Sequence, residues 1–180
     1  MAQLFADYRP TDRGTPIAVD VRPLERRDID ECTALAVERN GGVPATWHGS
    51  FERSLSRADQ QTFVASHDGR VVGYGTTAWM DLSTQDGARN VPDGWYLTGV
   101  VVAPAYRRRG VGRLLTEERL RWLGPRTDSV WYFATAMNKS SLDLHTALGF
   151  QEVTRDFAVP GVTFTGGEGV LSVKDLTGPR

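Results

Sequence analysis

The sequence predicts an α/β fold of the α+β kind, in which helices cover the faces of a mixed sheet. We expect a mostly antiparallel central sheet of about six to seven strands, flanked by about four helices. Three observations support this prediction: strand-like and helix-like segments alternate, Asp68-Gly69 separates two strand-like runs, and a strand ending at Val102 leads into a glycine turn and a helix. The chain has 180 residues, enough for one well-cored domain, and no repeat or linker divides it.

Local signals indicate where several elements begin, turn or end. Asp28, with Glu31 three residues later, has the pattern of a helix N-cap followed by a variant of the capping box. Asp68-Gly69 is a dipeptide favoured where a two-residue hairpin turn needs positive φ. The run Val100-Val101-Val102 suits the end of a strand that is buried on both faces.

The predicted elements follow the order β-α-α-β-β-β-α-β-α-β-β. Residues 1–16, with prolines and a glycine among charges, are predicted to be a loosely ordered N-terminal arm. The strands are predicted at 17–22, 62–67, 70–80, 95–102, 130–135, 151–159 and 169–176. The helices are predicted at 28–39, around Trp47, Phe51 and Leu55, from near Gly110 to 123, and at 140–148. The third helix takes its apolar face from Val111, Leu114, Leu115, Trp122 and Leu123.

Composition and charge exclude several classes of protein. The formal charge is 21 − 22 = −1, so no global basic field favours a nucleic acid or an anionic membrane as partner. The single Cys32 excludes an intrachain disulfide, and His48, His67 and His145 lie too far apart in sequence for metal-ligand spacing, so no metal is predicted. No apolar run could span a bilayer and the N-terminus lacks a secretory pattern, so we expect a cytoplasmic protein.

The most informative segment joins the strand ending at Val102 to the helix that starts near Gly110. Backbone N–H groups at a helix N-terminus point outward, and with the helix dipole they form an anion site. Gly110 and Gly112 let the backbone approach a phosphate without a Cβ in the way. Cations that can pair with phosphate oxygens come from Arg107, Arg108, Arg109 and Arg113. We therefore predict a phosphate-binding turn, although a surface turn with solvated arginines would carry the same residues.

This turn resembles the signature of the GNAT superfamily of N-acetyltransferases, Q/R-x-x-G-x-G/A, which Arg107, Gly110 and Gly112 match. A dinucleotide-binding turn would need a glycine in place of Leu115, and the mononucleotide P-loop pattern is absent. The segment 138–150 resembles a second family motif, N-x-x-A-x-x-x-Y-x-x-x-G-F, at the separation typical of the family. The resemblance implies that residues 17–180 form a single N-acetyltransferase domain.

The resemblance also implies an activity. An acetyl-CoA-dependent N-acyltransferase would transfer the acetyl group of acetyl-CoA, its co-substrate, to a primary amine of a small molecule or peptide by direct attack in a ternary complex. Family members often form dimers, so a homodimer is one option. Two alternatives stay open: a non-catalytic acyl-CoA-binding or sensing module, and an acyltransferase that uses a longer acyl-CoA.

For the co-substrate, the resemblance implies that backbone amides of the turn hold the pyrophosphate, from Arg108 through Val111 to Arg113. Main-chain groups of Val100 and Val102 would bind pantetheine as an added strand does, and an amide on that strand would polarise the thioester carbonyl. Asn138 matches an asparagine that touches the pantetheine arm, and Ser141 lies in the same segment. Asn138 also fits a helix N-cap, and the two roles are compatible.

The catalytic groups are less defined. His145 stands where the family usually has a tyrosine that protonates the departing thiolate, and histidine could do the same; the alternative is packing on its helix with a bond to a backbone carbonyl. The predicted strand 95–102 lacks the carboxylate or histidine that many relatives use as base; its inward candidates are Tyr96 and Thr98. Asp93 and Asp81 flank the polar loop and could act directly or through water, although solvated loop carboxylates are commoner.

The acceptor side is the part that the sequence leaves open. Residues 40–60 and 81–94 correspond to the regions that shape the acceptor pocket in the family, and 161–169 is a candidate flexible tip. An aromatic wall could come from Trp47, His48 and Phe51, although aromatics at this spacing more often form core. Attraction for a cationic amine could come from Asp81, Asp86 and Asp93. Aminoglycoside-like drugs, polyamines, amino acids and peptide N-termini all fit these features.

Overall fold

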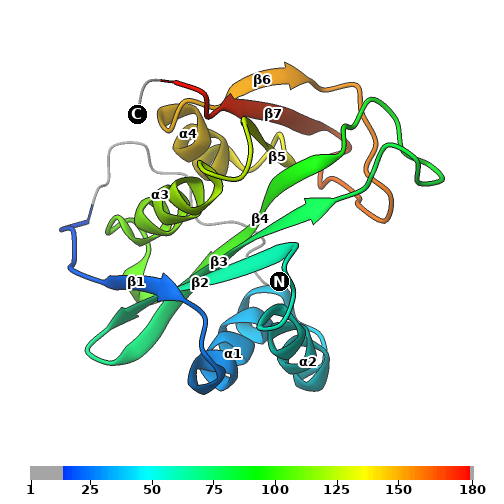
Figure 1. Ribbon diagram of the computed structural model, residues 1–180. Helices are drawn as coiled ribbons and strands as arrows, with labels where there is room; N and C mark the ends of the chain where they lie inside the picture. Colours follow the sequence, from blue (N-terminus) through cyan, green and yellow to red (C-terminus); the bar gives the residue numbers. More distant parts are fainter. Residues whose placement is uncertain (1–13, 179–180) are drawn as a thin grey trace. The chain divides into compact units, whose positions relative to one another are not determined.

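The computed structural model describes residues 14–178, so most of the predicted N-terminal arm lies outside the described residues. Within them, seven strands follow the sheet order β1-β2-β3-β4-β5-β7-β6, and four α-helices accompany the sheet (Figure 1). The pairs β1–β2, β2–β3, β5–β7 and β6–β7 are antiparallel and the pair β4–β5 is parallel, so the predicted fold class is confirmed. The bounds are β1 Asp20–Pro23, α1 Ile29–Asn40, α2 Pro44–Ser54, β2 Gln60–His67, β3 Arg70–Met80, β4 Gly94–Val102, α3 Val111–Leu123, β5 Ser129–Thr135, α4 Lys139–Ala147, β6 Gln151–Thr154 and β7 Gly169–Asp175.

The chain forms two compact units. The first contains the residues up to Ala78 together with Thr98–Arg121, and the second contains Trp79–Leu97 together with the residues from Trp122 onward. The predicted single domain over 17–180 stays a prediction. Among the described residues, no helix is long and apolar enough to cross a membrane.

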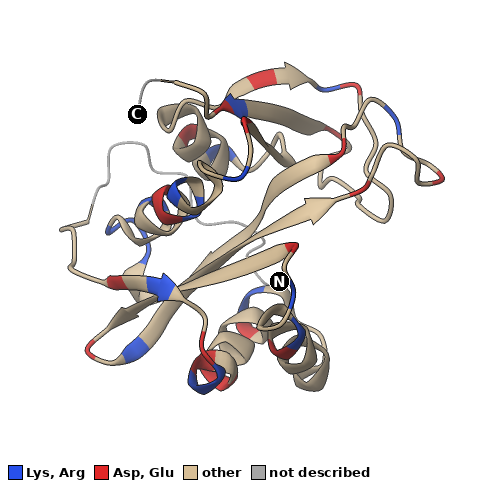
Figure 2. Ribbon diagram, viewed as in Figure 1, with Lys and Arg blue, Asp and Glu red and all other residues tan. Residues whose placement is uncertain are grey.

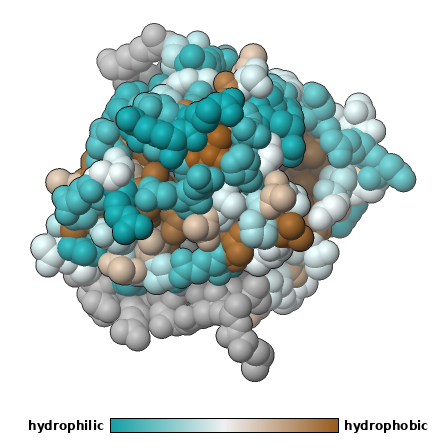
Figure 3. Space-filling view, turned by 90° about the horizontal axis from the view of Figure 1, so that it is seen from below, coloured by the Kyte–Doolittle hydropathy of each residue, from teal (hydrophilic) through white to brown (hydrophobic). Residues whose placement is uncertain are grey.

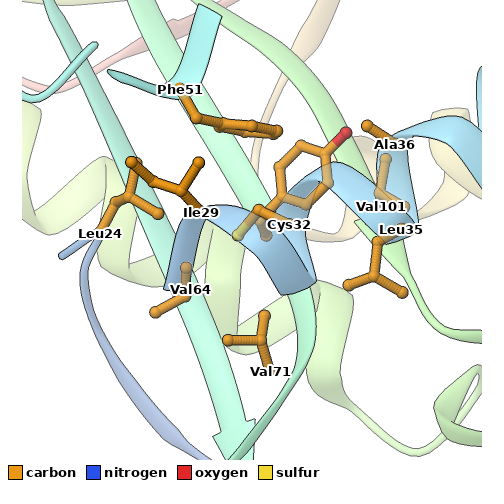
Figure 4. Packing of buried hydrophobic residues seen from close by; sticks show 10 residues of the cluster. Leu24, Ile29, Cys32, Leu35, Ala36, Phe51, Val64, Val71 and Val101 are labelled. Atoms are coloured by element: carbon orange, nitrogen blue, oxygen red, sulfur yellow. The ribbon is translucent and has the colours of Figure 1, made fainter. Parts of the chain in front are cut away.

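In the first unit, α1 and α2 pack on one face of β2 and β3 around a hydrophobic core (Figure 4). Cys32 and Ala36 of α1 are fully buried, and they lie four residues apart on the same side of the helix. Phe51 of α2 meets Tyr74 of β3 edge to face, with ring centroids 5.1 Å apart. The core also contains Leu24, Ile29, Leu35, Val64, Val71 and Val101. The helical spacing read from the sequence is thus the spacing of the buried face.

The other face of β3 is shaped by glycines at alternate positions. A Cβ on Gly73 would lie 2.8 Å from the Val101 carbonyl oxygen and 3.3 Å from Leu115 of α3. A Cβ on Gly75 would lie 3.1 Å from Nε of Arg119, also on α3. Side chains alternate between the two faces of a strand, so both glycines face α3. They let α3 and β4 approach β3 more closely than larger residues would.

Two details of the first unit confirm or correct the sequence prediction. Asp68 and Gly69 have φ of 50° and 77°, as the predicted hairpin turn requires. Asp28 is the N-cap residue of α1, as predicted, but its side chain does not cap that helix, so the predicted capping box with Glu31 is wrong. A 3-10 turn at Arg26–Asp28 precedes α1, and the Asp28 carboxylate accepts from the Glu25 N–H at 2.8 Å in a capping box of that turn. Asp28 also accepts hydrogen bonds from Arg22 at 2.7 and 2.8 Å.

The burial predicted for the end of β4 and for one position of α3 is also wrong. Val101 is buried, but Val100 and Val102 are only partly buried and Gly99 is exposed. The fully buried stretch is instead the beginning of the strand, Gly94–Leu97. Leu114 is 38% exposed and does not belong to the buried face of α3. An apolar run shows that a strand is hydrophobic, but it does not show which part of the strand is covered on both faces by other elements.

In the second unit, alternate residues of β5 serve different layers. Tyr132 lies against α4, where its ring stacks on that of His145. Phe133 faces the opposite cluster and meets Tyr96 with ring centroids 5.8 Å apart. Buried members of that cluster are Leu82, Val91, Tyr96, Phe157, Val159 and Leu171. Because side chains alternate between the two faces of β5, α4 lies on one face of this strand and the aromatic cluster lies on the other.

The two long loops of the second unit are joined to each other. Arg89 and Ala158 exchange two backbone hydrogen bonds of 3.1 and 2.8 Å, and Arg89 also pairs with Asp156. This exchange explains why the predicted strand 151–159 is shorter than expected, since β6 ends at Thr154 and the chain then turns toward residues 81–93. Phe164 packs against Phe133 and Phe157, with centroids 6.1 and 5.2 Å apart. The loop carrying the predicted flexible tip thus has an aromatic anchor.

Surface charge is mixed in sign. Lys and Arg alternate with Asp and Glu along α1 and along α3 (Figure 2). The face in Figure 3 is largely hydrophilic, with hydrophobic residues gathered in separate small patches. Figure 2 shows no broad field of one sign, as the near-zero net charge predicts.

Candidate functional site

The turn between β4 and α3 has two residues at positive φ. After Val102 the chain makes a 3-10 turn at Pro104–Tyr106, then passes through Arg108 with φ of 61° and Gly110 with φ of 91°. Gly110 is exposed, and a Cβ there would meet nothing within 4 Å. Leu114 N–H donates to the Gly110 carbonyl at 3.1 Å, so the helix ladder starts with this bond. The N–H groups one to three residues earlier belong to the first turn of α3, where no intrahelical acceptor exists.

The arginine side chains of this turn are held by the protein itself. Nε of Arg107 donates to the Val102 carbonyl at 3.1 Å, and Nε of Arg109 donates to the Thr15 carbonyl at 3.1 Å. Arg113 is exposed and pairs with Glu117 one helical turn later at 2.8 Å. These contacts connect the turn to β4, to the segment at Thr15 and to the next turn of α3.

Backbone alternation along β4 determines which edge each residue presents. Ala103 N–H donates to the Val72 carbonyl of β3 at 2.9 Å, so the main chain of Ala103 faces β3. Successive residues of a strand present their main-chain groups to opposite edges, which places those of Val102 and Val100 on the edge away from β3. The two predicted pantetheine-binding residues therefore share one edge.

Arg119 is not among the residues that the sequence patterns singled out. This side chain is only 1% exposed, although its neighbours on the buried face of α3 are Leu115, Thr116 and Leu123. It donates hydrogen bonds to carbonyl oxygens of both β3 and β4. Its position four residues after Leu115 and four before Leu123 was the available signal, because it puts a charged residue on an apolar stripe.

In the second unit, the structure brings Asn138, Ser141 and His145 together at α4. Asn138 is the N-cap, and its Oδ1 accepts from the Ser141 N–H at 3.3 Å. The Ser141 hydroxyl accepts from the Tyr132 hydroxyl at 2.7 Å. The N-cap role is therefore present, and the role in binding pantetheine stays a prediction.

His145 is buried, at 4% exposure, and its ring lies parallel to Tyr132 with centroids 3.6 Å apart. Its Nδ1 is 2.8 Å from the Ser141 carbonyl oxygen. A carbonyl only accepts, so Nδ1 carries a proton and donates it, and in the neutral ring Nε2 holds the lone pair. The packing alternative described from the sequence is therefore present, and only Nε2 remains for proton transfer.

The two other predicted catalytic residues hold the start of β4. Tyr96 is 0% exposed and donates its hydroxyl to the Pro92 carbonyl at 2.6 Å; burial raises the pKa of this phenol. Asp93 accepts from the Ser83 hydroxyl at 2.6 Å and from the N–H groups of Ser83 and Leu82 at 2.7 Å each. The hydrogen bonds from Ser83, followed by that from Leu82, lower the pKa of Asp93 and weaken it as a base. Both residues thus have structural roles that account for their contacts.

The candidate acceptor residues divide into core and surface. Phe51 is buried in the first unit and Trp47 packs against the same core, donating its indole N–H to the Gly41 carbonyl at 2.8 Å. The core alternative therefore describes these two aromatics, while His48 lies at the surface near Glu52. In the second unit, Asp81 accepts the indole N–H of the exposed Trp79 at 2.7 Å. Among the described residues, no three His, Cys, Asp or Glu side chains are grouped as metal ligands.

Comparison with known proteins places the chain among acetyltransferases. A family model described as the acetyltransferase (GNAT) family matches residues 24–150. Aminoglycoside N(6')-acetyltransferase type 1 of Salmonella typhimurium is 28% identical over 142 residues, which cover 76% of this chain and 94% of that protein. N-alpha-acetyltransferase RimI of Mycobacterium tuberculosis is 27% identical over 135 residues, covering 75% and 80%.

Solved structures share the fold. The ribosomal-protein-S18-alanine N-acetyltransferase of Escherichia coli superposes with a TM-score of 0.66 at 21% identity, covering 91% of this chain and 97% of that one. At this identity the likeness concerns the arrangement of strands and helices.

Proposed function

Because the chain belongs to the acetyltransferase (GNAT) family, we propose that it transfers the acetyl group of acetyl-CoA to a primary amine of a small molecule or peptide. The family makes it an N-acyltransferase. The observation that carries the finer proposal is the turn at Arg107–Arg113, where positive φ at Arg108 and at the exposed Gly110 precedes the first turn of α3.

In this proposal the turn holds the pyrophosphate of acetyl-CoA. The N–H groups from Arg108 to Arg113, Val111 and Gly112 included, donate to phosphate oxygens, and the dipole of α3 adds positive potential. Gly110 leaves open space on the backbone where oxygens approach. The arginines add charge and give the turn its shape through Val102 and Thr15.

The pantetheine arm is assigned to main-chain groups of Val100 and Val102, which share the edge of β4 away from β3. An extended ligand binds such an edge as an added strand does. Asn138 and Ser141 of α4 are assigned to the same arm. Asn138 can serve as both cap and ligand, because its side-chain oxygen accepts from Ser141 while its NH₂ group has two donors.

The chemistry is direct attack in a ternary complex. The amine nitrogen bonds to the thioester carbonyl carbon, the carbonyl electrons move to oxygen, and the C–S bond then breaks with its electron pair on sulfur. The attacking nitrogen becomes positively charged and releases a proton, and the thiolate takes one. His145 would accept a proton at Nε2, where its neutral ring holds the lone pair because Nδ1 is committed to Ser141, and would deliver it to sulfur. Asp93 and Tyr96, the candidate bases, carry contacts that favour structural roles. We therefore infer that an amine arriving unprotonated attacks without a dedicated base from these residues.

The relatives bear on the acceptor. One relative is named as an aminoglycoside N(6')-acetyltransferase and another as an N-alpha-acetyltransferase, so both names specify acetylation of an amine nitrogen. A primary amine is therefore the acceptor class that we propose for this chain. A sensing module without turnover is the competing proposal, and an acceptor panel separates the two.

Titration calorimetry with acetyl-CoA tests the proposal. Gly112 lies in the first turn of α3, so Gly112→Asp places a carboxylate where it stabilises the helix and repels a phosphate. We expect micromolar binding to the wild type and affinity about 100-fold weaker in Gly112→Asp, because like charges brought together at an interface cost several kcal/mol. Gly112→Ala is the matched control and should bind within about threefold of the wild type, since it adds no charge.

Failure of the folded wild type to bind acetyl-CoA would overturn the proposal. Binding without turnover across a broad panel of amines would favour the sensing module. Turnover with one class of amine would identify the acceptor.

A further inference from the structure

Residues 14–18, which precede β1 (Figure 1), lie against the turn that leads into α3. The Ile17 N–H donates to the Arg109 carbonyl at 3.3 Å. In the other direction, Nε of Arg109 donates to the Thr15 carbonyl at 3.1 Å, and these two residues are 94 positions apart in the sequence. One residue of the turn is thus held by this segment through both its main chain and its side chain.

The far end of the segment reaches the same turn through a histidine. Nδ1 of His67, the last residue of β2, is 2.8 Å from the Ala18 carbonyl oxygen, and since a carbonyl only accepts, Nδ1 donates. The His67 ring in turn packs against Tyr106, with centroids 5.7 Å apart. Tyr106 ends the 3-10 turn that comes just before the arginines. The segment therefore contacts the turn directly at Arg109 and indirectly at Tyr106.

The residue between these contacts has an unfavourable backbone conformation. Three described residues other than glycine have positive φ: Asp68, Asn90 and Arg108. Asp and Asn enter the left-handed region several times more often than other residues, and arginine has no such preference. Its Cβ lies too close to a carbonyl oxygen there, which costs free energy. A residue persists in such a conformation only where its surroundings determine it.

The surroundings of Arg108 do determine it. On one side, Nε of Arg107 donates to the Val102 carbonyl, and on the other side Arg109 is held by residues 14–18. The backbone of Gly14 also approaches closely, since a Cβ there would lie 3.2 Å from Cγ of Arg109 and 3.5 Å from the Arg108 carbonyl oxygen. The left-handed residue is thus fixed between two anchored neighbours.

We propose that residues 14–18 hold Arg108 at positive φ and so preorganise the turn that binds the pyrophosphate of acetyl-CoA. This inference rests on the proposed function. If the segment were detached, Arg108 would relax to negative φ in the free protein, and binding would have to restore the left-handed conformation. The cost of that change would then weaken the affinity. Ile17 acts as a positioning residue, because it touches the turn and not the co-substrate.

The substitution Ile17→Pro tests this role. Proline has no N–H, and its ring would stand where the Arg109 carbonyl oxygen now accepts the hydrogen bond, so the segment is pushed off the turn. We expect acetyl-CoA affinity, measured by titration calorimetry, to fall about tenfold. Tenfold corresponds to about 1.4 kcal/mol, the order of the cost of the left-handed region. Ile17→Val keeps the N–H and the branched side chain, and as the matched control it should bind within about twofold of the wild type.

A second background separates preorganisation from a merely structural role. Glycine adopts positive φ without a steric penalty, so in an Arg108→Gly chain the segment has less to hold in place. There we expect Ile17→Pro to weaken the affinity by less than about threefold, and the difference between the two effects measures the coupling of Ile17 with Arg108. A segment that only stabilises the fold would lower the melting temperature in both backgrounds and leave the affinity of the folded protein unchanged.

Kinetics supply a further readout. We expect Ile17→Pro to raise KM for acetyl-CoA while kcat stays within about twofold, since the segment acts on binding and not on the reacting atoms. Should this variant fail to fold, His67→Phe and Arg109→Lys take its place. The first keeps a ring against Tyr106 and removes the donor to Ala18, and the second keeps the charge without a donor at the Nε position. Each should bind acetyl-CoA at least about threefold more weakly than the wild type.

The outcomes distinguish the inference from the function on which it rests. Wild-type affinity in folded Ile17→Pro, or an equal loss of affinity in both backgrounds, overturns the inference and leaves the proposed function standing. Absence of acetyl-CoA binding by the folded wild type overturns the proposed function and this inference with it.

Discussion

The turn before α3 and the start of α4 both lie at a helix N-terminus, and they treat their polar groups in opposite ways. At the first, Gly110 is exposed, while the side chains of Arg107 and Arg109 donate to carbonyls of the protein. At the second, Asn138 caps the helix and His145 is buried against Tyr132. The first region is the one to which we assign backbone donors for a ligand, and the second uses its polar side chains largely for contacts within the protein.

The largest effect that would sharpen this contrast is expected at His145. His145→Phe keeps an aromatic ring for the stack on Tyr132 and removes both ring nitrogens. If Nε2 protonates the leaving thiolate, kcat should fall about 100-fold, the usual contribution of a positioned proton donor. Steady-state kinetics with the best acceptor measure kcat, and calorimetry should show acetyl-CoA affinity little changed.

The control for this prediction is the stability of the same variant. Thermal unfolding should show that His145→Phe is folded, since the ring volume is similar. A folded variant with wild-type kcat would assign His145 to packing alone and would make the two regions differ more sharply than we propose.

The next largest effect is expected on substitution of two glycines that have positive φ. Gly110 and Gly149 have φ of 91° and 88°, so alanine at either position should lower the free energy of unfolding by about 1–2 kcal/mol. Only Gly110→Ala should also weaken acetyl-CoA binding, by about tenfold if about 1.4 kcal/mol of preorganisation is lost. At Gly149 the new methyl group meets only the flexible Lys174 ammonium. Equal binding by both variants would contradict the backbone role of the turn.

The smallest effect is expected at Asn138. Asn138→Ala should lower the free energy of unfolding by about 1 kcal/mol through loss of the N-cap, whereas Asn138→Ser should keep the cap. If the amide also binds pantetheine, both variants should raise KM for acetyl-CoA by about three- to fivefold, the effect of one neutral hydrogen bond. Chemical denaturation and steady-state kinetics measure the two quantities. Recovery of both quantities in Asn138→Ser would leave the cap as the residue's only role.

Sequence patterns predicted the fold class, the hairpin at Asp68-Gly69 and the order of the elements, because these depend on local periodicity and on residues with restricted backbone preferences. They were less successful wherever a distant partner decides. Asp28 has the composition of a helix cap, yet Arg22 binds its carboxylate and Glu31 accepts from Val71 N–H across 40 residues. Val100-Val101-Val102 is uniformly apolar, yet only Val101 is buried.

The sequence by itself determined the strand, glycine turn and helix that identify the family, because a tight turn at positive φ followed by an amphipathic helix is a local property of consecutive residues. Only the tertiary structure decided what the side chains do. Arg119 becomes a link between β3 and β4 because Gly75 leaves room for its guanidinium. Tyr96 and Asp93 become supports of β4 because Pro92 and Ser83 lie within hydrogen-bonding distance. Which groups meet depends on how the strands and loops pack, and neither spacing nor residue type contains that information.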